Sequence, residues 1–434
     1  MGAQMAQLGM SLTDVIMVGR YNSVDLAGVA LGTSVMWPVI LLMMGIGLAV
    51  TPAVAQLDGA RKYAEIGEII RQGLWMAIVG GLVASLLLFN IAPLYGFMRV
   101  DPAAAAISVQ FLKMIACGVP ALICFYCFRY LSDGTGFTRP ALYIAVAALL
   151  CKIPLNYILI YGYFGLPELG GVGCGVAHAI TMWTQLLLIL VVVTRKRFHY
   201  TRWMMQFSWP DWHRIKPLAI VGLPIGMTLF AEVGLFSLTL LLLGQFGAEV
   251  VAAHHIAMSI SSITFHLPLA LGMAATIRIG FRVGAAEILQ ARTTAAIAIA
   301  STMCFGVVAA IGILLFRDAM VAIFTTDQGV HDLAYTLLLF VVFFLVFDAT
   351  QATVMGCLRG YKDTRWPLSI ALFSYWVVGL PLGSLLGFGW LGETMGVFGF
   401  WIGLSTGLGI AACLLCIRLW RVSKDAELIS ALAS

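Results

Sequence analysis

The chain has 434 residues, of which 61% are hydrophobic and only 10% are charged, whereas about 25% of the residues of soluble domains carry a charge. A soluble protein of this size has too little interior to bury so many apolar side chains. The formal net charge of +5 comes mainly from Lys and Arg in loops, so it reports membrane topology and gives no reason to expect a nucleic-acid partner.

Long apolar runs predict the fold class, an all-α polytopic membrane protein. Barrel strands would alternate apolar and polar residues, and irregular backbone cannot face lipid, so a helical bundle is predicted. Runs long enough to cross a bilayer, about 17–25 residues or more when tilted, occur about twelve times. The expected transmembrane helices are 2–19, 26–56, 74–95, 104–128, 141–162, 172–194, 218–244, 250–277, 294–316, 333–358, 368–388 and 396–417.

The loops predict the orientation. Most of the 25 Lys and Arg residues fall in loops on one side, whereas the other side holds Arg20, Arg99 and Arg317. By the positive-inside rule both termini are cytoplasmic. The first apolar run follows Met1 directly, without the basic leader of a cleavable signal peptide. Because this helix then has no cytoplasmic flank, we expect it to be truncated and the protein to begin upstream.

The two halves of the chain resemble each other. A shift of 225 residues pairs Gly19 with Gly244 and Thr51 with Thr276, and six spans precede a basic linker as six follow it. An even number of spans gives both halves the same orientation, which predicts two pseudo-symmetric six-helix lobes of a rocking transporter. The expected boundaries are an N-terminal lobe at 1–194, a cytoplasmic linker at 195–217, a C-terminal lobe at 218–417 and a cytoplasmic tail at 418–434.

Three acidic residues stand alone inside apolar stretches, namely Asp14, Glu232 and Asp348. A charged side chain at mid-bilayer costs about 2.5–3.5 kcal/mol on insertion scales, so it usually faces a cavity and handles an ion or a proton. The competing interpretation is a carboxylate hydrogen-bonded between helices for structure alone. Three of them in one chain favour the functional interpretation.

Glu232 and Asp348 lie on the seventh and tenth predicted helices of the same half. If these helices adjoin, the two carboxylates share one pocket, where they can carry a proton near neutral pH or offer oxygen ligands to a small cation. They are therefore the predicted metal ligands if the cation is Na⁺. Asp14 has Asn156, on the fifth helix, as its expected polar neighbour.

The remaining polar residues in the spans are weaker candidates. His178, His254, His255 and His266 could relay protons, but packed, hydrogen-bonded rings are expected, and Lys113 and Lys152 are expected to snorkel or to be paired. The sequence Gly403–Gly407 matches G-x-S-x-G but lies in an apolar helix without the required strand and turn. Neither a Walker loop nor a zinc motif is present, so an enzyme is not predicted and no cofactor is expected.

Several motifs, taken together with their spacing, carry a family resemblance over essentially the whole chain. They are Asp14-Val15-Ile16-Met17-Val18-Gly19, Thr51-Pro52-Ala53-Val54-Ala55-Gln56, Pro154-Leu155-Asn156-Tyr157, Ala252-Ala253-His254 and Leu358-Arg359-Gly360-Tyr361-Lys362-Asp363. In these residues the chain resembles the multidrug and toxic compound extrusion (MATE) transporters, specifically their bacterial NorM-like branch.

The resemblance implies a two-lobed antiporter of the bacterial inner membrane, monomeric, that exports lipophilic, cationic drugs and dyes as Na⁺ or H⁺ enters. By position, Glu232 and Asp348 resemble the family's cation site in the C-terminal lobe. Asp14 resembles the essential carboxylate of the N-terminal lobe, with Asn156 beside it. His255 stands where this branch usually has Gln, and His178 stands where Thr is common.

Two other functions are compatible with parts of this pattern. A lipid-linked sugar or lipid flippase of the same superfamily would line its cavity with several Lys and Arg to hold phosphates, but only Lys113 and Lys152 lie within spans. An intramembrane hydrolase would need two reactive groups on adjacent helices, and Asp14 and Asp348 lie in different halves. The drug and cation antiporter is therefore the predicted function.

Overall fold

The computed structural model describes residues 2–93, 95, 102–165, 167–390 and 392–433, so Met1 and Arg99 of the topology argument lie outside the described residues. The described chain is helical and divides into two compact units, residues 1–226 and 227–434. Each unit is built from long helices with many exposed apolar side chains, such as Leu86 on one helix and Leu315 on another. Such surfaces suit lipid as the surrounding solvent, and the helical fold class is confirmed.

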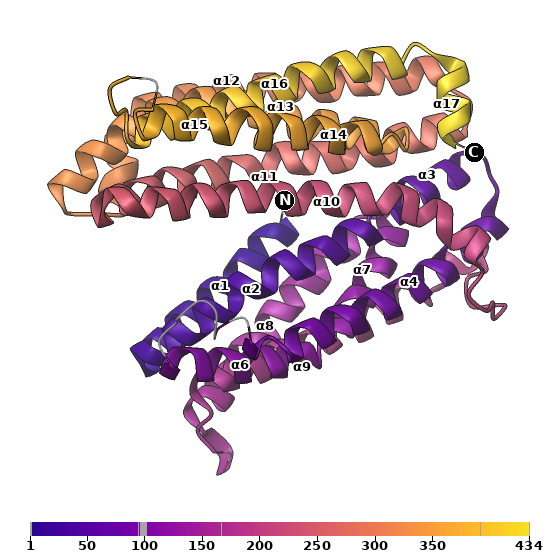
Figure 1. Ribbon diagram of the computed structural model, residues 1–434. Helices are drawn as coiled ribbons and strands as arrows, with labels where there is room; N and C mark the ends of the chain where they lie inside the picture. Colours follow the sequence, from indigo (N-terminus) through magenta and orange to yellow (C-terminus); the bar gives the residue numbers. More distant parts are fainter. Residues whose placement is uncertain (1, 94, 96–101, 166, 391, 434) are drawn as a thin grey trace. The chain divides into compact units, whose positions relative to one another are not determined.

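Unit 1 runs from indigo to magenta in Figure 1. Its helices are α1 (Gly2–Tyr21), α2 (Ser23–Gly47), α3 (Val50–Gly59), α4 (Tyr63–Phe89), α6 (Pro102–Ala116), α7 (Val119–Gly134), α8 (Arg139–Tyr161) and α9 (Gly170–Val193), with short 3₁₀ turns at Tyr163–Gly165 and Lys196–Thr201. Within this unit α8 packs against α1 and α9, α2 packs against α6, and α4 packs against α7.

Unit 2 runs from rose through orange to yellow in Figure 1. It receives the second part of α10 (Trp212–Leu243) and contains α11 (Ala248–Gly284), α12 (Ile288–Ala322), α13 (Gln328–Gly360), α14 (Arg365–Leu372), α15 (Leu380–Gly387), α16 (Val397–Val422) and α17 (Ala426–Ala433). A 3₁₀ turn at Gly244–Phe246 and a π-helical segment at Phe373–Gly379 complete it. Helix α13 packs against α11, α12 and α16 and is the centre of the unit's core.

The observed helices follow the predicted spans. Among the described residues ten helices are long and apolar enough to cross a bilayer, or eleven when the bent pair α6 and α7 is one span. Helix α1 is also 20 residues long, but its Gln4, Gln7 and Asp14 make it less apolar. The predicted helix 104–128 is bent by 48° between α6 and α7, where Pro120 cannot donate a backbone hydrogen bond. The predicted helix 26–56 is likewise divided into α2 and α3 just before Pro52.

The linker residues that join α9 to α10 are held by hydrogen bonds to side chains of α4. Arg71 donates from Nε to Ser208 Oγ (2.8 Å), and Gln72 donates from Nε2 to the Trp209 carbonyl (3.0 Å) while its Oε1 accepts from the Asp211 backbone N–H (2.9 Å). Trp75 donates from Nε1 to the Ser208 carbonyl at 3.0 Å. These bonds give the linker a defined path along unit 1, although most of its side chains are exposed.

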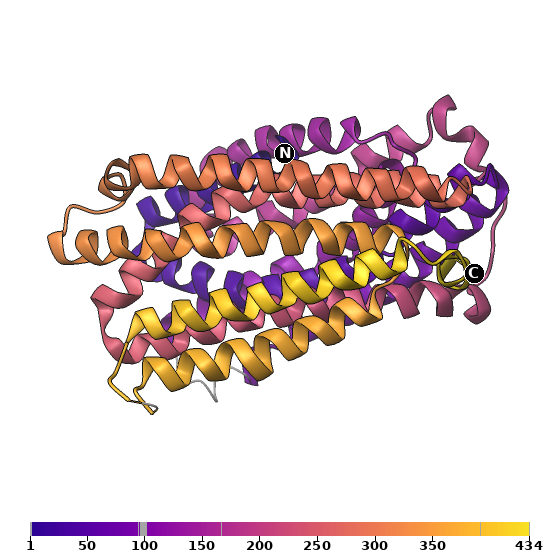
Figure 2. The same cartoon turned by 90° about the horizontal axis from the view of Figure 1, so that it is seen from above.

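Glycines set the closest helix contacts of unit 2. Gly379, Gly383 and Gly387 repeat every four residues opposite Gly399, Gly403 and Gly407 of α16, so that backbone meets backbone. This spacing of small residues allows the close approach typical of membrane helices. Figures 1 and 2 both show α15 and α16 side by side.

A second glycine contact joins α11 to α13 and supports a stability prediction. A Cβ on Gly356 would overlap the backbone of Gly272, which cannot move aside as a flexible side chain would. We expect Gly356→Ala to lower the free energy of unfolding by about 1–3 kcal/mol or more, which thermal melting of the detergent-solubilised protein would detect. The matched control is Gly312→Ala on α12, where a Cβ would meet nothing within 4 Å. Equal melting temperatures of the two variants would contradict the prediction.

Candidate functional site

Asp14 of α1 is the centre of a buried charged cluster in unit 1. Its Oδ2 accepts from Lys152 Nζ at 2.6 Å and its Oδ1 accepts from Asn156 Nδ2 at 2.7 Å. His178 of α9 places Nδ1 3.0 Å from Lys152 Nζ and 3.7 Å from Asp14 Oδ2. The expected pairing of Asp14 with Asn156 is therefore present in the geometry, and a cation and an imidazole join it.

Helix periodicity explains the cluster. Lys152 and Asn156 are four residues apart and lie on one face of α8, which packs against α1. His178 is four residues after Cys174 on α9, and Cys174 is close enough to Asp14 to interact with it. Sequence reasoning named Asn156 but gave Lys152 and His178 no role at this site. The i, i+4 spacing of Lys152 and Asn156 was a signal that could have identified Lys152.

Burial makes this cluster energetically significant. Lys152 is 1% exposed and Asn156 is fully buried, while Asp14 is 9% exposed. A buried charge is costly unless it is paired and hydrogen-bonded, and here the ammonium and the carboxylate compensate each other. Because an ammonium only donates hydrogen bonds, His178 Nδ1 accepts from Lys152 in this arrangement and the imidazole is neutral.

A cavity of about 400 Å³ lies beside this cluster, entirely within unit 1. Its polar wall includes Asp14, Lys152, His178 and Gln185. The remaining wall is largely apolar, aromatic and thioether side chains, including Met10, Val29, Met36, Trp37, Tyr126 and Met182. A space of this size with a few polar groups can accept a drug-sized molecule or part of one.

Unit 2 brings Glu232 of α10 and Asp348 of α13 together. The two helices adjoin, since the rings of Phe236 and Phe344 are 6.1 Å apart in an edge-to-face contact. The charges of the two carboxyl groups are close enough to interact. Asp348 is 4% exposed, and its Oδ1 has no hydrogen-bond partner among the described residues.

Other polar atoms around this pair are also without hydrogen-bond partners in the described part of the chain. Gln351 follows Asp348 by three residues on the same face of α13, and Tyr375 lies in the π-helical segment, close enough to both carboxylates for their charges to act on it. The Gln351 and Tyr375 side chains are close enough to act on each other, but neither Gln351 Oε1 nor Tyr375 OH makes a well-formed hydrogen bond among the described residues. Carboxylate, amide and phenol oxygens are suitable ligands for a small hard cation. Sequence reasoning missed Gln351, which the i, i+3 spacing could have indicated, and Tyr375, which no local pattern indicated.

The histidines differ in their surroundings. His178 belongs to the Asp14 cluster, whereas His254 is buried on α11 with its ring centroid 5.6 Å from that of Trp401. His255 is exposed on α11. Of these two residues, only His178 contacts a predicted site residue, Asp14, in the described structure.

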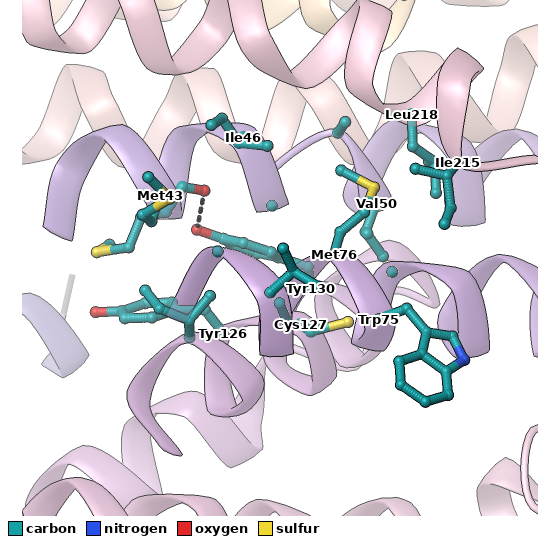
Figure 3. A pocket seen from close by; sticks show the side chains of 18 of the residues that line it. Met43, Ile46, Val50, Trp75, Met76, Tyr126, Cys127, Tyr130, Ile215 and Leu218 are labelled. Carbon is teal, nitrogen blue, oxygen red and sulfur yellow. Dashed lines mark hydrogen bonds between the residues drawn. The ribbon is translucent and has the colours of Figure 1, made fainter. Parts of the chain in front are cut away.

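A second cavity of about 400 Å³ in unit 1 has an almost wholly apolar wall. Figure 3 shows Met43, Trp75, Tyr126 and Tyr130 around it, with the Tyr130 hydroxyl donating to the Met44 carbonyl at 3.1 Å. Ile215 and Leu218, at the start of α10, close one side. Among the described residues, no Asp, Glu, Lys, Arg or His side chain lines this cavity.

Comparisons with known proteins agree with this architecture. A family model described as MatE matches residues 1–158 and 224–385. Over 429 residues the chain is 41% identical to the multidrug resistance protein PmpM of Pseudomonas aeruginosa, covering 97% of this chain and 89% of that protein. It is 38% identical over 427 residues to the probable multidrug resistance protein NorM of Idiomarina loihiensis, covering 98% of this chain and 92% of that protein.

Solved structures share the fold. A MATE protein in its bent conformation superposes with a TM-score of 0.90 at 21% identity, covering 100% of this chain and 94% of that one. At this identity the likeness concerns the fold alone, and it confirms the predicted all-α, two-lobed fold. Since the family model matches most of the chain and the similar curated relatives are bacterial proteins of the NorM type, the resemblance found in the sequence is confirmed. This membrane-spanning chain belongs to the MatE family, in its bacterial NorM-like branch.

Proposed function

We propose that this protein is a secondary active multidrug efflux antiporter, and not an enzyme, that exports lipophilic, often cationic compounds in exchange for Na⁺ or H⁺. The relatives named above are multidrug resistance proteins. The observation that carries the proposal is the buried carboxyl group of Asp348, which lies beside Glu232 and has an oxygen without a partner in the described structure. A buried polar group left unpaired is costly, so a proton or cation bound there would gain free energy.

The roles of the site residues follow from their chemistry. Glu232 and Asp348 bind the entering ion, as ligands of Na⁺ or as acceptors of a proton, and the oxygens of Gln351 and Tyr375 complete the site. Asp14, positioned by Asn156, is the carboxylate of unit 1 that senses the charge of the exported compound. The coupling ion is a transported substrate, and no further cofactor is needed.

The cellular arrangement is part of the proposal. The protein lies in the bacterial inner membrane as a monomer with both termini cytoplasmic, since the basic loops fall on one side. Lobes at 1–194 and 218–417 are joined by the cytoplasmic linker 195–217 and followed by the tail 418–434. Lipid and small-molecule drugs, dyes or organic cations are its partners, and nucleic acid is not.

Proteoliposomes loaded with a cationic dye test this function when the Na⁺ gradient and the pH gradient are imposed one at a time. An ion gradient of about fifty-fold stores about 2.3 kcal/mol per ion, which one-for-one exchange can convert into at most about fifty-fold accumulation of the dye. We expect dye to accumulate against its gradient with at least one of the two ions, and accumulation to stop when an ionophore collapses that gradient. Dye movement indifferent to both gradients would contradict antiport, and gradient-independent movement of a labelled lipid-linked sugar would indicate the flippase.

A further inference from the structure

Asp14 of unit 1 already holds a cation that belongs to the chain itself. The Lys152 ammonium lies 2.6 Å from Asp14 Oδ2, in the place where a monovalent cation bound by this carboxylate would lie. Its side chain is only 1% exposed, so it does not snorkel to a surface. A cation that binds Asp14 Oδ2 at this place must therefore first displace this ammonium.

Among the described residues, the surroundings of Asp14 supply no second cation. Of the helices packed against α1, α8 contributes Lys152 and α9 contributes His178 and Cys174, whereas the acidic residue of α2, Asp25, lies in the first turn of that helix. The Asp25 carboxylate is engaged elsewhere, accepting from the backbone N–H of Gly171 at 2.8 Å. Lys152 thus supplies the full positive charge in contact with Asp14 within the described structure, and the pair as a whole is neutral.

The ammonium can leave Asp14 without losing every partner. His178 Nδ1 lies 3.0 Å from Lys152 Nζ, on the wall of the same cavity as Gln185. A displaced ammonium can keep its hydrogen bond to the imidazole and direct its remaining donors into the cavity. The cost of separating the pair is therefore smaller than that of leaving a buried charge with no partner at all.

Displacement favours one chemical class of cation. Na⁺ must lose its hydration shell and gains nothing from the apolar cavity wall, whereas a lipophilic organic cation also buries its hydrocarbon surface against side chains such as Met36 and Trp37. Only the organic cation has a second source of binding free energy with which to compete against a tethered ammonium.

From this geometry we infer that Lys152 is a built-in counter-ion of Asp14 that competes with organic cations and excludes Na⁺ from unit 1. The inference deepens the proposed function and rests on it for the substrate class. Lys152 then determines specificity: it lowers the affinity for cationic compounds, reoccupies Asp14 when they leave, and confines any bound Na⁺ to Glu232 and Asp348.

Equilibrium binding to the purified full-length protein tests the inference without transport. The background carries Glu232→Gln and Asp348→Asn, so that the ion site of unit 2 is removed. In this background we expect Lys152→Gln to bind tetraphenylphosphonium at least about tenfold more tightly. We also expect Na⁺ to compete with tetraphenylphosphonium only when Lys152→Gln is present. Lys152→Arg, which keeps the charge, should behave as the background does.

The matched control is Lys113→Gln. Lys113 is the other lysine within the spans. Its Nζ lies 5.4 Å from the centroid of the Phe89 ring, and Lys113 is not among the residues that line the cavity beside Asp14. This control should leave affinity and Na⁺ competition unchanged. Unchanged affinity in Lys152→Gln, or the absence of Na⁺ competition in that variant, would overturn the inference.

Two further outcomes remain decisive. If no variant binds tetraphenylphosphonium, the proposed substrate class fails, and thermal stabilisation of Lys152→Gln by Na⁺ alone then decides whether the ammonium excludes the ion. If Lys152→Gln does not fold, the double variant Asp14→Asn/Lys152→Gln decides. A counter-ion role predicts that removing both charges restores folding, whereas independent roles predict a still less stable protein and would refute the inference.

Discussion

Asp348→Asn is expected to abolish gradient-driven dye efflux while the protein stays folded in the membrane. An Asn side chain has nearly the shape of Asp but can neither accept a proton nor present a negative charge to Na⁺. Without ion binding at this site, entry of the ion can no longer drive export of the dye. With an ion gradient of about fifty-fold, accumulation of the dye in proteoliposomes should fall from about fifty-fold to about one-fold.

The control for this variant lies on the same helix. Asp332→Asn changes the same functional group near the start of α13, where the side chain is 69% exposed, and should leave efflux intact. Glu232→Gln should reproduce the loss, because its charge interacts with that of Asp348. Undiminished accumulation by Asp348→Asn would show that this carboxyl group is structural only.

Asp14→Asn should produce the largest loss of stability among single substitutions at these sites. The change leaves the Lys152 ammonium, 1% exposed, without its carboxylate partner, and breaking a buried ion pair from one side costs about 3–5 kcal/mol. We expect a lower free energy of unfolding in mixed micelles and a lower melting temperature, together with loss of cationic dye binding in unit 1.

A second substitution separates stability from function. Asp14→Asn/Lys152→Met removes both charges and replaces the ammonium stem by an apolar side chain of similar length, so most of the lost stability should return. Dye binding in unit 1 should not return, because the carboxylate is still missing. A double variant as unstable as Asp14→Asn alone would mean that the two side chains stabilise the protein independently.

The sequence predicted the helices well because lipid requires long apolar runs, and these are visible without tertiary information. It underestimated their lengths where charged residues lie near the ends: α12 extends from Ile288 to Ala322, beyond the expected 294–316 and past Arg317. A long side chain near the end of a span can reach the interface, so such a charge does not end the helix. The division before Pro52 and the bend before Pro120 follow from proline chemistry, which the apolar pattern does not report.

The candidate site was predictable only in part. Lone carboxylates in apolar runs identified Asp14, Glu232 and Asp348, and the adjacency of α10 and α13 brings the latter two together as the spacing suggested. The Lys152 partner of Asp14 was not predicted, although Lys152 lies one helical turn before Asn156 on α8, because a lysine in a span can equally snorkel to the membrane surface. Tyr375 reaches the second site through a π-helical segment, and no periodic pattern in the sequence encodes that local change of register.

The glycine contacts between α15 and α16 have a mechanical consequence. Two helices with interdigitated side chains can slide or rotate against each other only if those side chains move aside. At Gly383 and Gly403 backbone packs directly on backbone, so no side chain blocks such a movement. Small axial displacements there meet low steric barriers, and the lost dispersion energy is spread evenly along the contact. This part of unit 2 can therefore shear by small steps without being unpacked.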